Sequence, residues 1–91
     1  MDEFVKAALN WCNEMRVQRD MEPLEDLPKG VRGDPASCPC GTATGLFVGH
    51  QTFSDRENVI GTVPYNVHCF TLKFDSGDYP EYDEEFWGEL V

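Results

Sequence analysis

A stretch rich in proline and glycine follows the first 20 residues of this sequence. Residues 22–36, EPLEDLPKGVRGDPA, contain three prolines and two glycines. Proline lacks an amide donor and fixes one backbone dihedral angle, so this composition excludes a long helix across the stretch. We therefore expect a linker here, with one helix before it and a compact unit after it.

Residues 2–20, DEFVKAALNWCNEMRVQRD, have the spacing of an amphipathic helix. Phe4, Ala8, Cys12 and Met15 follow one another at intervals of four, four and three residues. That spacing places the four side chains on one helix face. Acidic residues at the beginning and arginines near the end also complement the helix dipole. The pattern predicts an amphipathic N-terminal helix over 2–20.

The central part of the chain predicts a short helix followed by a hairpin. Residues 37–43 can form a short second helix, with Asp34 or Ser37 as its capping residue. The stretches LFVGHQTF and ENVIGTV are rich in β-branched and aromatic residues, and the polar turn SDRE separates them. This arrangement predicts a two-stranded β-hairpin over 46–63. Two strands alone are marginally stable in water, so the hairpin must pack on a helix.

Residues 64–76, PYNVHCFTLKFDS, fit two periodicities. Alternate residues are apolar, as in a strand, but apolar residues also recur at helical intervals from Val67 onward. Pro64 suits a first helical turn and Gly77 suits a C-terminal cap. The two ends favour a helix over 64–76. Together these elements predict a single α+β domain spanning residues 1–91.

The distribution of charge limits the partners of this domain. The chain carries 17 acidic and 7 basic residues, for a net charge of −10. Seven of the acidic residues lie from Asp75 onward, where there is no lysine or arginine. Phosphate backbones are repelled by such a surface, so we expect no direct binding of nucleic acid. No apolar run approaches the roughly 20 residues of a membrane span, so we expect no membrane partner.

The last segment, residues 77–91, combines these acids with aromatic side chains. Aromatic residues anchor many protein interfaces, and acids complement a basic partner. The segment is therefore a candidate surface for a basic protein, including a nucleic-acid-binding protein whose DNA site the acids imitate. The alternative is an acidic face whose aromatic side chains fold back onto the core. The candidate partner-binding residues are Tyr79, Tyr82, Asp83, Glu84, Glu85 and Trp87.

Four cysteines raise the question of metal or redox chemistry. The N-terminus lacks the basic start and apolar run of a secretory signal, so we expect a cytoplasmic protein with reduced thiols. Zinc prefers four ligands, which Cys38, Cys40, His68 and Cys69 could supply. However, C-x-C is a rarer zinc geometry than C-x-x-C, and adjacent His68 and Cys69 point apart. We expect no cofactor, with buried cysteines in the core and zinc as the alternative.

Thiol-dependent catalysis is the alternative that the sequence supports least. Cys38 or Cys40 could act as a nucleophile with His50 or His68 as the general base. The sequence contains no serine-hydrolase elbow, zinc-protease or phosphate-loop motif. We therefore expect a non-catalytic protein, with a small thiol-dependent enzyme as the alternative.

Two stretches of the chain, 9–40 and 62–82, resemble a known family. The motifs DLPKG and GDPASCP in the first and FDSGDYPE in the second are similar to those of small uncharacterised proteins of actinobacteria and their phages. The resemblance implies a helix over 64–76 and a bacterial host cytosol. It implies no activity, because none is assigned to that family.

These observations lead to one functional expectation and its alternatives. We expect a small acidic protein-binding module, including a phage-encoded modulator of a host protein. The first alternative is a small zinc-binding protein using Cys38 and Cys40, and the second is the thiol-dependent enzyme. The oligomeric state and the identity of the partner are left open by the sequence.

Overall fold

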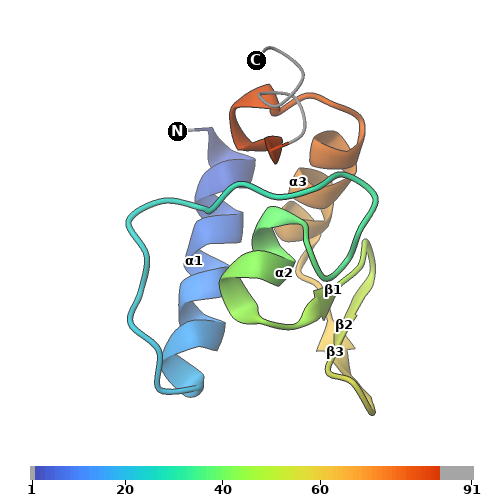
Figure 1. Cartoon of the computed structure of the whole chain (residues 1–91). Helices are drawn as coiled ribbons and strands as arrows, with labels where there is room; N and C mark the ends of the chain where they lie inside the picture. Colours follow the sequence, from blue (N-terminus) through green and yellow to red (C-terminus); the bar gives the residue numbers. More distant parts are fainter. Residues whose placement is uncertain (1, 85–91) are drawn as a thin grey trace.

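The computed structural model describes residues 2–84, which form an α+β domain (Figure 1). Its elements in chain order are α1 (Glu3–Gln18), α2 (Pro39–Thr44), β1 (Phe47–Val48), β2 (Thr52–Ser54), β3 (Val59–Thr62), α3 (Tyr65–Asp75) and a short 3-10 helix, η1 (Pro80–Tyr82). The predicted fold class and the predicted helix over 64–76 are confirmed. None of the helices within residues 2–84 is long and apolar enough to cross a membrane.

Helix α1 is the support on which the other two helices pack. The Asp2 side chain caps its first turn by accepting a hydrogen bond from the Val5 amide at 2.8 Å. Its buried face contains Ala8 and Cys12 as the spacing predicted, whereas Phe4 and Met15 are partly buried at the margin. The buried residues of α1 are Val5, Ala8, Leu9, Trp11 and Cys12.

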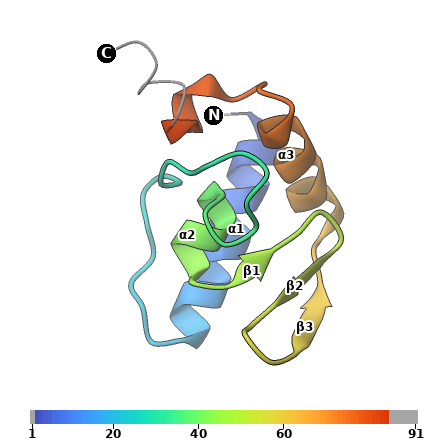
Figure 2. The same cartoon turned by 45° about the vertical axis from the view of Figure 1, so that its right-hand side comes forward.

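The linker returns along α1 (Figure 2) because polar side chains of the helix hold it there. The Asn13 side chain donates to the Leu24 carbonyl at 2.9 Å and accepts from the Leu24 amide at 2.8 Å. The Arg16 guanidinium donates to the carbonyls of Glu22 and Ala43. One arginine therefore joins α1 to both the linker and α2.

The segment GDPASCPCG forms a tight turn and the beginning of α2. The carbonyl of Asp34 accepts hydrogen bonds from the amides of Ser37 and Cys38. Cys38 is the N-terminal cap of α2, since its sulfur accepts from the Gly41 amide at 3.3 Å. The prediction of Asp34 or Ser37 as this cap is therefore wrong. Asp34 instead stabilises the preceding turn, where its side chain accepts from the Ala36 amide.

Two glycines allow this turn to pack closely against its neighbours. A Cβ atom on Gly30 would lie 2.4 Å from the carbonyl oxygen of Ser37. A Cβ atom on Gly41 would lie 2.3 Å from the carbonyl oxygen of Pro35. Both distances are shorter than any tolerated contact, so both positions require glycine.

The predicted two-stranded hairpin is wrong in its strand number. Residues 46–53, expected as one strand, form β1 and β2, because the chain reverses between Val48 and Thr52. The Gly49 amide donates to the Thr52 carbonyl at 3.0 Å and closes this reversal. The sheet is antiparallel with the order β1-β2-β3, and β3 forms its outer edge (Figure 2).

The core lies between α1, α3 and the inner face of this sheet. Phe70 and Phe74 of α3 are almost completely buried. The Trp11 ring meets the Phe53 ring edge-on, with centroids 5.0 Å apart, and so joins α1 to β2. Helix α3 ends before Gly77, whose φ of +87° suits glycine and lets the chain turn back over the core.

Replacing Gly41 by alanine tests the close packing of the turn. Helix propensity alone would make Gly41→Ala stabilising by about 1 kcal/mol. We expect the opposite, a loss of about 1–3 kcal/mol in unfolding free energy, because the new methyl group meets the Pro35 carbonyl. Urea denaturation of both proteins measures this difference.

The control for this prediction is Thr42→Ser, which changes an exposed neighbour in the same helix and keeps the hydroxyl that donates to the Ser37 carbonyl. Its unfolding free energy should change by no more than about 0.5 kcal/mol. A Gly41→Ala variant as stable as the parent protein would show that the turn does not constrain α2.

Candidate functional site

The four predicted zinc ligands are separated in the structure. Cys40 is completely buried between α2 and α1, where its thiol contacts that of Cys12. Cys69 is half-buried on α3 and hydrogen-bonds with the Tyr65 hydroxyl. Within residues 2–84, no three histidine, cysteine, aspartate or glutamate side chains gather as a metal-binding group. The predicted set therefore does not converge on one point.

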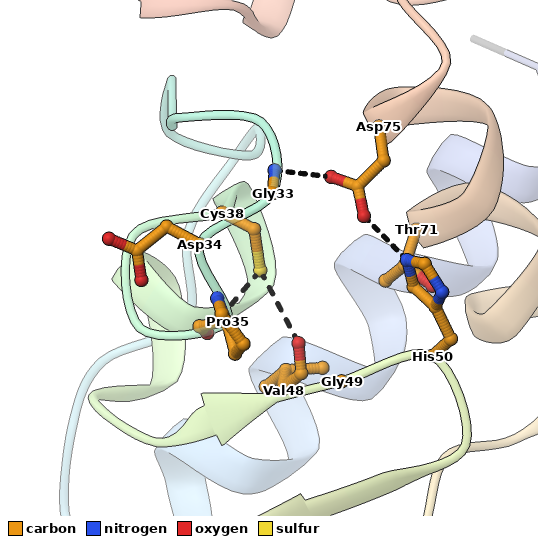
Figure 3. Close-up of a pocket in the computed structure, with 9 residues that line it drawn as sticks. All are labelled: Gly33, Asp34, Pro35, Cys38, Val48, Gly49, His50, Thr71 and Asp75. Carbon is orange, nitrogen blue, oxygen red and sulfur yellow. Dashed lines mark hydrogen bonds and ion pairs between the residues drawn. The ribbon is translucent and has the colours of Figure 1, made fainter.

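Cys38 lies in a cleft of about 260 Å³ between α2, the β1–β2 turn and α3 (Figure 3). Cys38 comes from the beginning of α2, His50 from the turn between the strands, and Asp75 from the last residue of α3. The cleft thus contains the residue types of a cysteine–histidine–aspartate catalytic set. The hydrogen bonds of each residue decide what this set can do.

Asp75 joins three segments that are distant in sequence. Its Oδ1 accepts the Gly33 amide at 2.9 Å, and its Oδ2 lies 2.5 Å from Nε2 of His50 (Figure 3). A carboxylate accepts hydrogen bonds, so Nε2 of His50 carries a proton. Asp75 therefore fixes the His50 ring and ties α3 to both the linker and the β1–β2 turn.

The thiol of Cys38 is held in its protonated form. Its sulfur lies 3.6 Å from the Pro35 carbonyl and 3.8 Å from the Val48 carbonyl, where the thiol can donate (Figure 3). Burial raises the pKa of Cys38 to about 11, and the nearby Asp75 carboxylate also raises it. A thiol is a poor nucleophile compared with its thiolate. This geometry suits a helix cap rather than an attacking group.

The structure places two of the predicted partner-binding residues in the interior. The Tyr79 ring is buried and stacks on Phe70, with centroids 5.0 Å apart. Asp83 is buried and pairs with the Arg32 guanidinium at 2.8 Å. The prediction that these two residues form an exposed recognition surface is therefore wrong. The reason is that α3 presents an apolar side that the returning chain covers.

The other predicted partner-binding residues of 77–91 are not buried as Tyr79 and Asp83 are, or lie outside the described residues. Tyr82 is half-buried, and its hydroxyl donates to the Asp26 carboxylate at 2.8 Å. Burial raises the pKa of Tyr82, and the hydrogen bond to Asp26 adds to this effect. Glu84 is exposed, with its amide bound to the Gly30 carbonyl. Glu85 and Trp87 lie outside the residues that the structure describes.

A different surface exposes large apolar side chains. Val59 and Ile60 of β3 are 68% and 51% exposed, and Tyr65 at the beginning of α3 is 76% exposed. Ile60 has no partner residue in β2, because a bulge lies between the two strands at this point. Alternation along a strand predicts that one of the adjacent residues Val59 and Ile60 faces the core, so sequence reasoning could not have found that both are exposed.

The backbone of β3 is also unpaired on its outer side within residues 2–84. The Val63 amide donates to the Gln51 carbonyl, so residues 51 and 63 are a hydrogen-bonded pair. Thr62 lies opposite Thr52 in the next, non-bonded pair of this antiparallel ladder. The amide and carbonyl of Thr62 therefore point away from β2. We call Val59, Ile60, Thr62 and Tyr65 the β3 edge.

Comparisons of the chain with models of protein families, with curated proteins and with solved structures gave no match. The Cys38 cleft and the β3 edge are the two features of the described residues that bear on function.

The reactivity of the four thiols tests the burial of the cysteines. We expect the aromatic disulfide reagent DTNB to modify one thiol quickly at pH 7.5, that of half-buried Cys69. Cys12, Cys38 and Cys40 are buried and should react only as the protein unfolds. Absorbance of the released thiolate gives the rates, and Cys69→Ser should remove the fast phase. A fast phase that persists in Cys69→Ser and disappears in Cys38→Ser would contradict a Cys38 thiol that is protonated and caps α2.

Proposed function

We propose that this chain is a small non-catalytic protein-binding module that holds an extended segment of a basic partner protein along the β3 edge. The observation that carries the proposal is an edge strand that combines exposed apolar side chains with backbone groups that β2 does not pair. Neither feature is needed by the core, since both face away from it.

The exposed side chains provide the apolar part of the interface. Burying a valine or isoleucine side chain completely contributes about 1.5–3 kcal/mol, and about half to two thirds of Val59 and Ile60 remains to be covered. Tyr65 adds an aromatic side chain of the type that anchors many interfaces. These three residues supply the apolar area that a bound peptide would cover.

The backbone of β3 provides direction and register for the bound segment. An extended peptide that adds to a sheet edge forms main-chain hydrogen bonds with the unpaired groups of that edge. On β3, the Thr62 amide and carbonyl are such groups. The strand has only four residues and a bulge, so it can pair with a short extended segment and not with a long strand. The bound segment is therefore a short one.

The charge of the chain favours a basic partner. The net charge is −10, and Glu14 of α1 lines a shallow groove together with Tyr65. Asp55 and Glu57 are exposed in the turn that leads into β3, on either side of the exposed Arg56, so the turn carries a net charge of −1. Together with Glu14 this excess of acid favours approach of a lysine- or arginine-rich segment to the β3 edge, which accelerates association. The bacterial or phage setting that the resemblance implies makes a host protein the expected partner.

Truncation of the β3 edge tests this proposal. We expect Val59→Ala with Ile60→Ala to weaken binding of the partner about tenfold, because about 1.4 kcal/mol of apolar contact is lost. The partner would be captured from an actinobacterial lysate, identified by mass spectrometry, purified and titrated by calorimetry. Val17→Ala is the matched control, since Val17 is 58% exposed but lies on α1.

Two further readouts separate this mode of binding from adventitious capture. The affinity for the purified partner should fall as salt is raised from 50 to 500 mM, because exposed charges are screened. Hydrogen exchange of the Thr62 amide should slow in the complex. Equal binding by the double variant and the parent, or an unchanged Thr62 exchange rate, would contradict the proposal.

A further inference from the structure

Two histidines face each other in a second cleft that adjoins the Cys38 cleft. His50 and His68 line it together with Thr62, Val63 and Tyr65. The two imidazole rings are nearly perpendicular, and their centroids are 6.5 Å apart. His50 borders both clefts, since one edge of its ring meets Asp75 in the first.

Hydrogen bonds fix the proton positions on both rings. Nδ1 of His68 hydrogen-bonds with the backbone carbonyl of His50, and a carbonyl can only accept. Nδ1 of His68 is therefore the protonated nitrogen, and Nε2 of the neutral ring keeps its lone pair. On His50 the proton is on Nε2, toward Asp75, so in the neutral ring Nδ1 carries the lone pair. Figure 3 shows this second nitrogen of His50 on the side of the ring away from Cys38.

These are the outer contacts that metal-binding histidines make. A ligating histidine usually donates its other ring N–H to a carboxylate or a backbone carbonyl, which orients the ring. His50 has the carboxylate and His68 has the carbonyl. We propose that Nδ1 of His50 and Nε2 of His68 bind one divalent transition-metal ion, such as Zn²⁺, Ni²⁺ or Cu²⁺. Water molecules would complete the coordination.

The spacing of the rings is compatible with a shared ion. A metal–nitrogen distance of about 2.0–2.1 Å places each ring centroid ~3.2 Å from the ion, so two ligating rings have centroids ~5–6 Å apart. The observed 6.5 Å requires a small rotation of the side chains. The His50 ring can make this rotation by pivoting about its hydrogen bond to Asp75, since the side chain is 44% exposed. The acidic surface of the chain also concentrates cations near the site.

This site differs from the cysteine set that the sequence suggested. It uses no thiol, and imidazole ligands favour Cu²⁺, Ni²⁺ and Zn²⁺ over Mg²⁺ or Ca²⁺. Asp75 does not touch the ion and acts as a positioning residue through His50. The inference does not depend on the β3 edge having a partner.

Calorimetric titration of the tag-free, chelator-treated full chain with ZnCl₂ or NiCl₂ tests the inference. We expect one equivalent to bind, with the affinity reduced at least tenfold by His68→Gln and by His50→Gln. Asp75→Asn should weaken binding about tenfold, as expected for an outer contact of a ligating histidine. The control Cys38→Ser should bind as the parent does. Binding that survives both histidine variants, or that is lost in Cys38→Ser, would overturn the proposal.

A spectroscopic measurement on the unmodified chain identifies the ligating atoms even if a histidine variant fails to fold. Long-range ¹H–¹⁵N spectra should show Nδ1 of His50 and Nε2 of His68 shifting on addition of Zn²⁺, while the two protonated nitrogens keep their proton-bound shifts. Unchanged imidazole ¹⁵N shifts at saturating Zn²⁺ would exclude this site. MgCl₂ at the same concentration should leave all four nitrogens unshifted and provides the control.

Discussion

The backbone of residues 34–38 lies directly against the Cα atoms of Gly30 and Gly41, and most of the structure depends on this contact. The carbonyl of Ser37 accepts from the Val31 amide at 2.7 Å, and the carbonyl of Pro35 accepts from the Val48 amide at 3.0 Å. The same turn therefore holds the linker on one side and β1 on the other. Because neither glycine position has space for a Cβ atom, no larger residue can replace them without moving the turn.

The turn also explains how α3 and the returning chain reach their positions. Asp75 at the end of α3 binds the amide of Gly33 in the linker. Gly30 forms a short parallel bridge with Asp83 beyond α3. Asp83 pairs with Arg32, and a buried carboxylate of this kind costs desolvation energy that the pair must offset. Its role is therefore to specify one position for the returning chain more than to add stability.

Local patterns in the sequence predicted α1 and α3 well because each one has both an apolar period and a defined end. The spacing of Phe4, Ala8 and Cys12 and the flanking Pro64 and Gly77 are such signals. The division of residues 46–53 into two strands could not be predicted, since it depends on a main-chain hydrogen bond between Gly49 and Thr52. A β-branched run describes the strand propensity of a segment, but it does not describe a reversal within it.

The candidate site was harder to predict because it depends on which distant side chains meet. The sequence contains Cys38, His50 and Asp75 without any spacing that connects them, and a turn, a strand reversal and a helix end bring them together. The sequence suggested Cys38 as a ligand or nucleophile, whereas its sulfur accepts a hydrogen bond from the Gly41 amide and so caps a helix. Tyr79 fits the alternative that the sequence left open, an aromatic side chain that folds back onto the core.

The β3 edge and the second cleft, which His50 and His68 line, are neighbours, because Thr62 and Tyr65 belong to both. They nevertheless depend on different chemical groups. Binding of an extended segment uses the Thr62 backbone and the apolar side chains of Val59 and Ile60, whereas a metal ion uses lone pairs on His50 and His68. A bound divalent cation would lower the negative charge beside the β3 edge and so weaken its attraction for a basic segment. By linkage, a basic partner on this edge would weaken metal binding by the same factor.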